Sequence, residues 1–333
     1  MQNPFRLVTL GAGTGQSMLL RGLCRPGVSV TAVVGVTDNG GHSGLLRRAL
    51  GIPQVGDSRN CLVAAADPAS PLAGLMDFRF SRGELAGVQV GNLIVAALTL
   101  QQGSITSALE TLSRAVGAKA RILPVSDGSA QVVGTLANGR RIVGEWDLMH
   151  RRPRTPLVSV AHKPRLSATP AVVAALRRAD AVVLAPGSLF TGLCSVLKAR
   201  GVGGVLRSRR RVPVVFVCNL MTQPGQTDGF DAGRHVEIIE AHLGRPLDGV
   251  VVNRVAPPAA LVRLYRRGGS VPVPPTGVPS HVRCVAADLV LRADRRTLRG
   301  FHRAAAPGMH GWLHLIRHDP AAVAKALQHW LGE

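Results

Sequence analysis

The sequence predicts an α/β fold with a mainly parallel sheet and a small β insertion. Short runs rich in valine, leucine and alanine alternate with longer helical stretches, which is typical of parallel strands joined by helical crossovers. The first run, FRLVTL, is followed at once by the glycine-rich GAGTG, where a strand would turn into a helix. A third feature is a cluster of hairpin-like runs in the middle of the chain.

The strands and helices of the main sheet can be placed by this alternation. We expect strands at residues 5–10, 30–36, 181–185, 213–217 and 249–253. We expect helices at residues 16–23, 92–101, 104–116, 170–178, 232–243 and 321–331. The last helix follows Asp319-Pro320, and proline is favoured in the first turn of a helix. The alternation continues along the chain, so a single domain over residues 1–333 is expected.

Residues 118–160 are expected to form the β-rich insertion within this domain. KARILPVS, AQVVGTL and RRIVGEW are short strand-like runs, and the turn sequences DGS and NGR separate them. Asn138-Gly139 is a good turn sequence for a β-hairpin.

The charge of the chain is strongly positive, with a formal value of +21. Only four of the 40 basic residues are lysines, which leaves 36 arginines, and the chain is also rich in Ala, Gly, Val and Pro. That pattern indicates a coding bias as much as selection for charge. Aromatic residues are 3% and the basic runs are dispersed, whereas nucleic-acid binding favours a basic stripe with exposed aromatics. We expect no specific nucleic-acid partner, only weak, salt-sensitive adhesion to polyanions.

The apolar runs argue against membrane insertion. VTAVVGV and RVPVVFVC fit buried strands and are too short to span a bilayer. The first residues lack the basic leader and cleavage site of a signal peptide, so the expected location is the cytoplasm. The five cysteines are scattered and form no CxxC pair, so neither disulfides nor a zinc site is expected.

The glycine-rich turn is a candidate phosphate site, because glycines let a ligand approach the backbone at a helix N-terminus. The spacing differs from the dinucleotide fingerprint G-x-G-x-x-G, since the third glycine comes one residue early and Gln16 follows it. A phosphate or sugar-phosphate is therefore favoured over a nicotinamide dinucleotide. A tight turn without a ligand is the alternative. The candidate binding residues here are Gly11, Gly13, Thr14, Gly15 and Ser17.

A long polar segment follows the second strand and should lie beside the glycine loop at the carboxyl edge of the sheet. Asp38 stands about where a dinucleotide fold places its ribose-binding acid. Asp38 and Asp57 also have the oxygen donors that Mg²⁺ prefers, and Asp38 is the candidate metal ligand. No cofactor is certain, and Mg²⁺ is the one considered. Asp57 could instead cap a helix or brace a loop. The candidate binding residues here are Asp38, Asn39, Gly40, Gly41, Ser43, Asp57, Arg59 and Asn60.

Two later loops also follow strands and should reach the same edge of the sheet. APGSLFTG offers backbone donors at a helix start, which suit a phosphate. CNLMTQPGQTDGF offers neutral hydrogen-bonding groups, which suit the edges of a sugar or base. Together with the segment GNLIVAAL, these stretches add the candidates Asn92, Gly187, Ser188, Asn219 and Thr222.

Seven sequence blocks, taken together, resemble the gluconeogenesis factor (YvcK) family, a relative of the 2-phospho-L-lactate transferases of deazaflavin coenzyme synthesis. The blocks are GAGTGQSMLLRGL, TDNGGHSGLLRR, GDSRNCL, GNLIVAAL, ADAVVLAPGSLFTGL, VCNLMTQPGQTDGF and IRHDPAAVAKAL. They occur in order over nearly the whole chain. The resemblance implies a Rossmann-like three-layer sandwich that binds a nucleotide-activated sugar, UDP-N-acetylglucosamine in the characterised bacterial branch. It also implies a role in carbon metabolism, cell-wall supply and cell shape rather than a settled reaction.

The resemblance further implies that a tyrosine and an arginine late in the chain bind the ligand. The matching positions are Tyr265 in LVRLYRRGG and Arg317 in LIRHDP. The ring would stack on the uracil and the guanidinium would pair with the diphosphate. The alternative for Tyr265 is a contact on a helix surface. Asn39 and His42 stand where relatives commonly have a second acid and a serine, which weakens a two-carboxylate metal site.

Four functional hypotheses follow, and the first is a cytoplasmic regulatory protein that binds a UDP-sugar. The second is a Mg²⁺-dependent phospholactate-type transferase, in which Asp38 holds the metal, with Asp57 as a second candidate ligand, and Arg59 stabilises developing phosphoryl charge. A nicotinamide-dependent oxidoreductase is disfavoured by the glycine spacing, and a nucleic-acid binder rests on charge alone. A homo-oligomer is an open alternative for the assembly.

Overall fold

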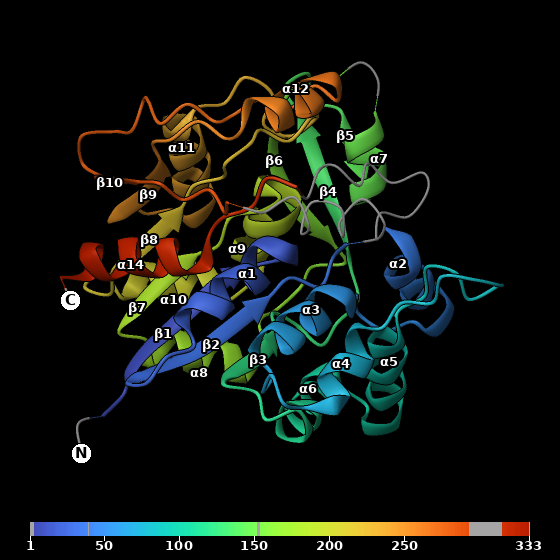
Figure 1. The fold of residues 1–333 in the computed structure, drawn as a ribbon. Coiled ribbons are helices and arrows are strands. Elements are labelled where there is room, and N and C mark those ends of the chain that lie inside the picture. Colours follow the sequence, from blue (N-terminus) through green and yellow to red (C-terminus); the bar gives the residue numbers. More distant parts are fainter. Residues whose placement is uncertain (1–2, 39, 152–153, 293–314, 333) are drawn as a thin grey trace.

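In the computed structural model, which describes residues 3–38, 40–151, 154–292 and 315–332, the chain forms a seven-stranded parallel sheet with helices on both faces (Figure 1). The strand order is β10-β9-β8-β7-β1-β2-β3. The strands are β1 Phe5–Gly11, β2 Val28–Val34, β3 Ala120–Pro124, β7 Ala181–Leu184, β8 Val214–Val217, β9 Gly249–Asn253 and β10 Arg283–Ala287. The predicted Rossmann-like α/β class is confirmed.

The order of the strands reverses beside β1. The chain adds β2 and β3 on one side of β1, and then adds β7 to β10 outward on the other side. The loops after β1 and β7 therefore leave the sheet in opposite directions at its carboxyl edge. In open parallel sheets, ligands bind in the crevice at this point.

Helices cover both faces of the sheet and bury a hydrophobic core on each. One core includes Leu20, Leu62 and Leu327, from α1 Gly13–Leu23, α3 Gly56–Ala65 and α14 Pro320–Leu331. The other includes Leu176, Leu206 and Ile239, from α8 Pro170–Arg178, α10 Val202–Ser208 and α11 Ala232–Leu243. Further helices are α2 Gly41–Leu50, α4 Pro71–Asp77, α5 Val90–Gln102, α6 Ile105–Ala115, α7 Glu145–His150, α9 Ser195–Lys198 and α12 Ala259–Arg267, with a π-helical segment at Leu189–Cys194.

The segment after β2 differs from the expected polar loop, because it contains the helices α2 and α3. Helix α2 lies between Gly40 at its N-cap and Gly51, which takes a left-handed conformation at its C-cap. Glycine and polar residues at both ends made this stretch look like a loop. Helix α1 also starts earlier than expected, at Gly13 instead of residue 16. The glycine loop is therefore part of the first helical turn.

The β insertion forms a separate antiparallel sheet in the order β5-β4-β6. Its strands are β4 Gln131–Leu136, β5 Arg141–Val143 and β6 Leu157–Lys163. The predicted turn is present, since the Asn138 side chain accepts a hydrogen bond from the Arg140 amide at 3.1 Å and Gly139 has φ +80°. The range 118–160 needs correction, because β3 pairs with β2 in the main sheet and β6 extends to Lys163. A short alternating run does not reveal which sheet it joins.

A buried glutamine ties the two central strands together beneath the glycine loop. The Gln16 side chain is fully buried, and its amide nitrogen lies 3.2 Å from the Thr9 carbonyl oxygen and 3.0 Å from that of Val33. It thus bridges β1 and β2. This explains why Gln16 occupies the position that a dinucleotide fingerprint gives to glycine.

Among the described residues, no helix combines the length and apolarity needed to cross a lipid bilayer.

Buried histidines should make the stability of this fold sensitive to acid. His318 is buried and its Nε2 donates a hydrogen bond to the Cys218 carbonyl at 2.9 Å. Burial lowers the pKa of His318 from 6.5 to about 4, and burial also lowers the pKa values of His235 and His242. Between about pH 4 and pH 6.5, His318 is protonated in the unfolded chain and neutral in the folded chain, so the unfolded chain binds more protons. Stability is therefore complete above about pH 6.5 and falls as the pH drops toward 4.

We predict that His318→Gln reduces this acid sensitivity, because glutamine keeps an amide donor for the Cys218 carbonyl but cannot take up a proton. The shift at His318 corresponds to about 3 kcal/mol between pH 6.5 and 4. Urea unfolding over this pH range should therefore show a smaller loss of stability in the variant than in the wild type. Parallel curves for the two proteins would contradict the assignment to His318.

Candidate functional site

Two of the three glycines in the first loop serve close packing. A methyl group at Gly15 would overlap the carbonyl oxygen of Pro186, and one at Gly11 would lie 2.7 Å from the Ala185 side chain. Pro186 and Ala185 follow β7 directly. These glycines therefore let the start of α1 pack directly against the loop after β7.

Gly13 is different, because a methyl group there would meet a single atom at an ordinary contact distance. Its φ is +63°, and the one atom within 4 Å of the position that a methyl group would take is Oδ1 of Asp57, at 3.8 Å. The Gly13 amide donates a hydrogen bond to the Asp57 carboxylate. Close by, Thr14 is exposed and Ser17 donates to the Thr14 carbonyl at 3.0 Å. The loop thus leaves space beside Gly13, while the Gly13 amide is already bound to Asp57.

Three carboxyl groups influence one another beside this loop. Desolvation raises the pKa of Asp57 to about 7, with a further contribution from the charge of Asp38. Desolvation also raises the pKa of Glu145 well above its ordinary value, and Asp38 again adds to the effect. The Thr191 hydroxyl donates to Glu145 at 2.6 Å, and the Gly40 amide donates to Asp38 at 2.8 Å. At neutral pH the site therefore carries less negative charge than three free carboxylates would.

Glu145 was not among the predicted site residues. It is the first residue of α7, which connects β5 and β6 of the small antiparallel sheet. The segment GEW carries no motif, so its neighbours Asp38 and Thr191 could be recognised only in the folded chain. Met149 of α7 also contacts the loop after β8, since its sulfur lies 2.9 Å from the Gln226 amide nitrogen. Helix α7 therefore forms a wall over the loops that follow β2, β7 and β8.

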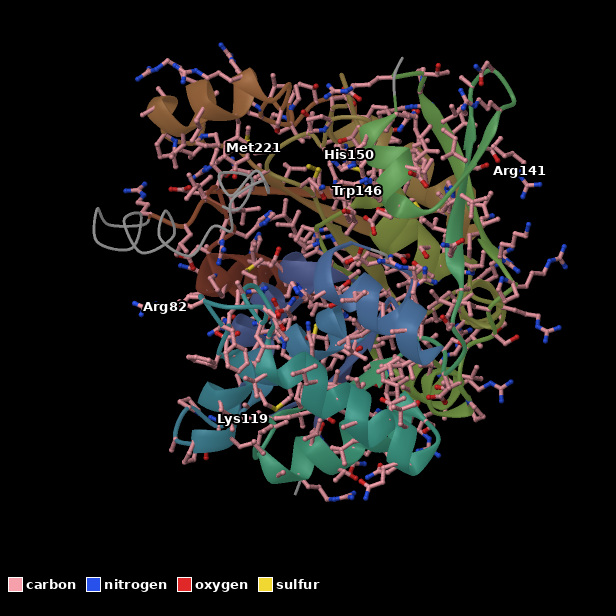
Figure 2. The ribbon with its side chains drawn as sticks, turned by 90° about the vertical axis from the view of Figure 1, so that its right-hand side faces the viewer. Arg82, Lys119, Arg141, Trp146, His150 and Met221 are labelled. Carbon is pink, nitrogen blue, oxygen red and sulfur yellow. The ribbon has the colours of Figure 1, made fainter. Side chains whose placement is uncertain are left out.

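Figure 2 shows α7, labelled at Trp146 and His150, on the same face of the molecule as Met221 from the loop after β8. The rings of Trp146 and His150 stack with their centres 3.8 Å apart. This face of α7 lies on the outer side of the candidate site.

The carboxylates can be tested for a fit to Mg²⁺. Within the described ranges, no group of three or more His, Cys, Asp or Glu side chains is arranged to hold a metal ion. Asp38 and Asp57 are close enough to influence each other's charge, which leaves a two-carboxylate arrangement. Mg²⁺ accepts such a site when phosphates and water supply its other ligands. These two residues therefore fit Mg²⁺ only when Asp57 is ionised and a phosphorylated ligand supplies further oxygens.

Asp57 and Arg59 both lie on α3 but have different surroundings. Asp57 lies in the first turn of α3 and not at its N-cap, which is Val55. Of its predicted alternative roles, the cap is therefore wrong, whereas the hydrogen bond from the Gly13 amide does brace a loop. Asn60 shares the Asp57 side of α3, because residues three apart are neighbours on a helix. Arg59 is 3% exposed and points into the protein.

Arg59 connects helices α3, α4 and α5. Its guanidinium donates to Asp77 at 2.9 Å, to Gln89 at 2.5 Å and to Asn92 at 3.3 Å. Asn92 in turn donates to Ser43 of α2 at 3.1 Å. Arg59, Asn92 and Ser43 thus use their polar groups to hold the helices behind the site. Arg59 has no arrangement suited to stabilising charge on a phosphoryl group.

Three predicted residues, Asn219, Thr222 and Ser188, brace the later loops. The Asn219 amide donates to the Gly187 carbonyl at 2.7 Å, which connects the loops after β8 and β7. Thr222 is 4% exposed, and its hydroxyl accepts a hydrogen bond from the Val271 amide at 2.9 Å. Ser188 accepts one from Gln223 at 3.1 Å. These contacts fix the shape of the crevice.

The late tyrosine is buried in a way that excludes the expected stacking. The Tyr265 ring is 2% exposed, and its hydroxyl accepts a hydrogen bond from the Ile316 amide at 3.0 Å. A ring this buried cannot stack on a uracil in this conformation. Tyr265 instead holds the segment that carries Arg317, a half-buried arginine whose pKa is lowered by burial. His318 anchors the same segment at the carboxyl end of β8 through the Cys218 carbonyl.

The predicted residues therefore fall into groups. The loops after β1, β2 and β7 meet at one edge and bring Gly13, Asp38 and Asp57 together with the residues around Gly187. Gly40 and Gly41 form the start of α2 in this region. Asn39 lies outside the described residues. Arg59, Asn92, Thr222 and Tyr265 support the site from within.

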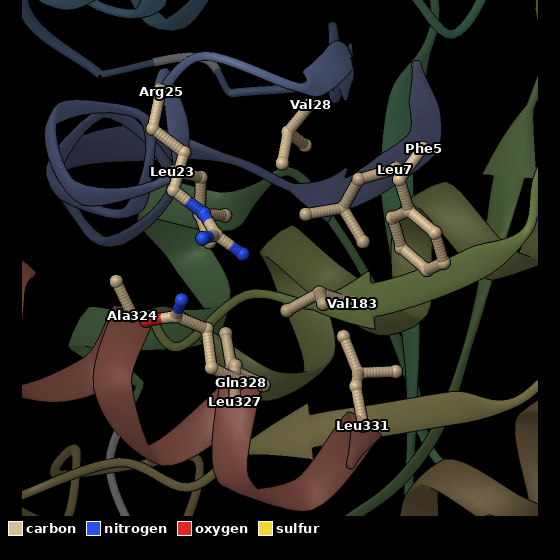
Figure 3. A pocket seen from close by; sticks show the side chains of 10 residues that line it. All are labelled: Phe5, Leu7, Leu23, Arg25, Val28, Val183, Ala324, Leu327, Gln328 and Leu331. Carbon is tan, nitrogen blue, oxygen red and sulfur yellow. The ribbon is translucent and has the colours of Figure 1, made fainter. Parts of the chain in front are cut away.

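Two hollows in the described part of the chain lie away from this crevice. One is a cavity of about 20 Å³ between α1, α14 and the sheet, next to Phe5 and Val28 at the amino ends of β1 and β2 (Figure 3). It is far smaller than the several hundred Å³ typical of ligand pockets. The other is an open groove lined by residues 207–212, before β8. The region around Gly13 is therefore favoured over both hollows as the ligand site, because of its chemistry and its place in the fold.

Comparison with known proteins identifies the family. The family model of 2-phospho-L-lactate transferase CofD matches residues 7–290. A Thermotoga maritima protein, named provisionally as a gluconeogenesis factor, is 40% identical over 266 residues, covering 80% of this chain and 84% of the relative. The Bacillus subtilis gluconeogenesis factor is 34% identical over 271 residues, with the same coverage of 80% and 84%.

A solved structure agrees with the sequence comparison. A crystal structure of a Bacillus halodurans protein superposes with a TM-score of 0.86 at 30% identity, and the match covers 97% of this chain and 99% of that one. A second crystal structure, described as a UPF0052 family member from the same organism, gives 0.86 at 29% identity, with coverage of 98% and 99%. The chain therefore belongs to the CofD family and is similar over most of its length to the gluconeogenesis factors.

Proposed function

We propose that this protein is a cytoplasmic regulatory protein that binds a nucleotide-activated sugar, UDP-N-acetylglucosamine, at the carboxyl edge of its sheet. The observation that carries the proposal is Gly13, beside which the loop leaves space at the point where the strand order reverses. A role in carbon metabolism, cell-wall supply and cell shape is proposed by analogy with the gluconeogenesis factors.

The electrostatics of the crevice support a diphosphate ligand. The raised pKa values of Asp57 and Glu145 favour their neutral forms, so repulsion of a diphosphate is reduced near neutral pH. Neutral carboxyl groups can also donate hydrogen bonds to phosphate or sugar oxygens. Arg317, on the segment anchored to the end of β8, supplies positive charge for the diphosphate.

A transferase of the phospholactate type is the second candidate function. Asp38 and Asp57 favour it, because this pair fits Mg²⁺ beside the glycine loop. The metal would neutralise phosphate charge during transfer. Arg59 no longer supports this alternative, since its guanidinium is committed to Asp77, Gln89 and Asn92.

We predict that Gly13→Val weakens UDP-N-acetylglucosamine binding, because valine would occupy the open space of the loop and strain a positive φ. Gly27→Val is the matched control. Gly27 has φ +79°, no atom within 4 Å of its side-chain position, and a place at the opposite edge of the sheet. Calorimetry should show lost affinity for Gly13→Val alone, while both variants lose some stability. Unchanged affinity in Gly13→Val would make the loop a simple turn.

We predict that Arg317→Ala weakens UDP-N-acetylglucosamine binding by roughly ten- to hundred-fold, the effect of a lost charge-assisted hydrogen bond. Arg317→Lys, which keeps the charge but loses the planar fork, should recover part of the affinity. Titration of both variants measures these effects. Wild-type affinity in Arg317→Ala would place the ligand elsewhere.

Tyr265→Phe should act mainly on stability. It removes the acceptor of the Ile316 amide, and a buried unsatisfied amide costs about 1–3 kcal/mol. Denaturant unfolding should show this loss. If stability is unchanged and UDP-N-acetylglucosamine affinity falls, the hydroxyl contacts the ligand directly.

We predict that Mg²⁺ does not change the affinity for UDP-N-acetylglucosamine, because Asp57 and Glu145 can take their neutral forms. A Mg²⁺ titration of wild type and Asp38→Asn should be flat for both proteins. Under the transferase alternative, Asp38→Asn would abolish Mg²⁺-dependent turnover and keep most of the nucleotide affinity. A Mg²⁺ requirement that disappears in Asp38→Asn would favour the transferase.

A further inference from the structure

Arginines gather at the amino edge of the sheet, opposite the candidate site. The run RSRRR at residues 207–211 precedes β8, and Arg177 and Arg178 precede β7. Arg245 precedes β9, and Arg6 lies in the first half of β1. Because the strands are parallel, all of these positions lie at the end of the sheet away from Gly13.

Some of these arginines have a structural role. In a parallel α/β fold the C-termini of helices lie at this edge, and their free carbonyl oxygens attract cations. Arg207 donates to the Leu243 carbonyl at the end of α11, at 3.1 Å. Arg245 donates to the carbonyl oxygens of Leu206 and Val212, both at 3.3 Å. Helix capping therefore accounts for these two arginines.

Arg210 and Arg211 are not explained by capping. Both are exposed, and their guanidinium groups make no hydrogen bond or ion pair with any residue that the structure describes. The acids nearby are already paired, since Asp180 binds Arg6 at 2.7 Å and Asp248 binds Arg245 at 2.6 Å. The edge thus keeps a local excess of positive charge. Residues 207–212 also line an open groove of about 620 Å³.

We propose that this groove binds an acidic, extended segment of a protein partner through Arg210 and Arg211. The neighbouring Arg6 forms a planar fork on Asp180, with bonds of 3.1 and 2.7 Å, so carboxylates are the anions that arginines of this edge already bind. Residues 207–212 include no aromatic side chain on which bases could stack. Duplex DNA carries one charge per about 1.7 Å of its axis, so a protein that binds it usually presents a long row of basic side chains. Residues 207–212 are too short a segment to form such a row.

The test compares two double variants that change the net charge equally. Arg210→Glu with Arg211→Glu reverses the groove, and Arg140→Glu with Arg141→Glu reverses an exposed pair on the β4–β5 hairpin. Arg141 is labelled at the rim of the molecule in Figure 2. The probe is a fluorescent polyglutamate peptide, measured by anisotropy at physiological salt, and a short DNA duplex serves as the competing probe. UDP-N-acetylglucosamine affinity is measured in parallel.

The groove variant should bind polyglutamate at least about ten-fold more weakly, which is a change of about 1.4 kcal/mol. The hairpin variant should change by less than about two-fold, because salt screens charges beyond about 8 Å. Sugar-nucleotide binding should be the same in both variants, whatever its strength. Equal losses in the two variants, or no polyglutamate binding by the wild type, would overturn the proposal. Stronger binding of DNA that depends on Arg210 and Arg211 would also overturn it.

Discussion

The close packing of α1 against the loop after β7 is the constraint on which the rest of the site depends. No side chain fits between Gly15 and the Pro186 carbonyl oxygen. The two backbones therefore meet at the point where the strand order reverses, next to Gly13. Asn219 extends the arrangement by connecting the loop after β8 to Gly187. The loops after β1, β7 and β8 are thus held together next to Gly15 and Gly187.

The carboxyl groups in that region lower one another's tendency to ionise. Desolvation and the proximity of Asp38 favour the neutral forms of Asp57 and Glu145 near neutral pH. The buried Arg59, two residues from Asp57 on the same helix, braces α3 against α5, and its charge offsets only part of the rise in the pKa of Asp57. Under the proposed function, a diphosphate would therefore meet less repulsion here than three free carboxylates would give. Under the transferase alternative, Asp38 and Asp57 would instead hold Mg²⁺ together with a phosphorylated substrate.

Sequence alone predicted the parallel sheet and the position of the glycine loop, because apolar runs and turn residues are local signals. It could not separate Gly13 from Gly11 and Gly15, since the difference lies in Ala185 and Pro186, which are far along the chain. Glu145 was missed for the same reason. Arg59 and Tyr265 were assigned to the ligand because of their residue types, yet burial commits both to internal hydrogen bonds. Helix α2 was missed because its glycines and polar residues resemble those of a loop.

Ligand-dependent thermal stability tests the central claim most directly, since a ligand selective for the folded state raises Tm by an amount that grows with its concentration and affinity. The comparison uses UDP-N-acetylglucosamine, UDP-glucose, GDP with Mg²⁺ and NAD. We expect UDP-N-acetylglucosamine to raise Tm increasingly with its concentration and NAD to have no effect. A rise with NAD alone, or no rise with either UDP-sugar, would contradict the account.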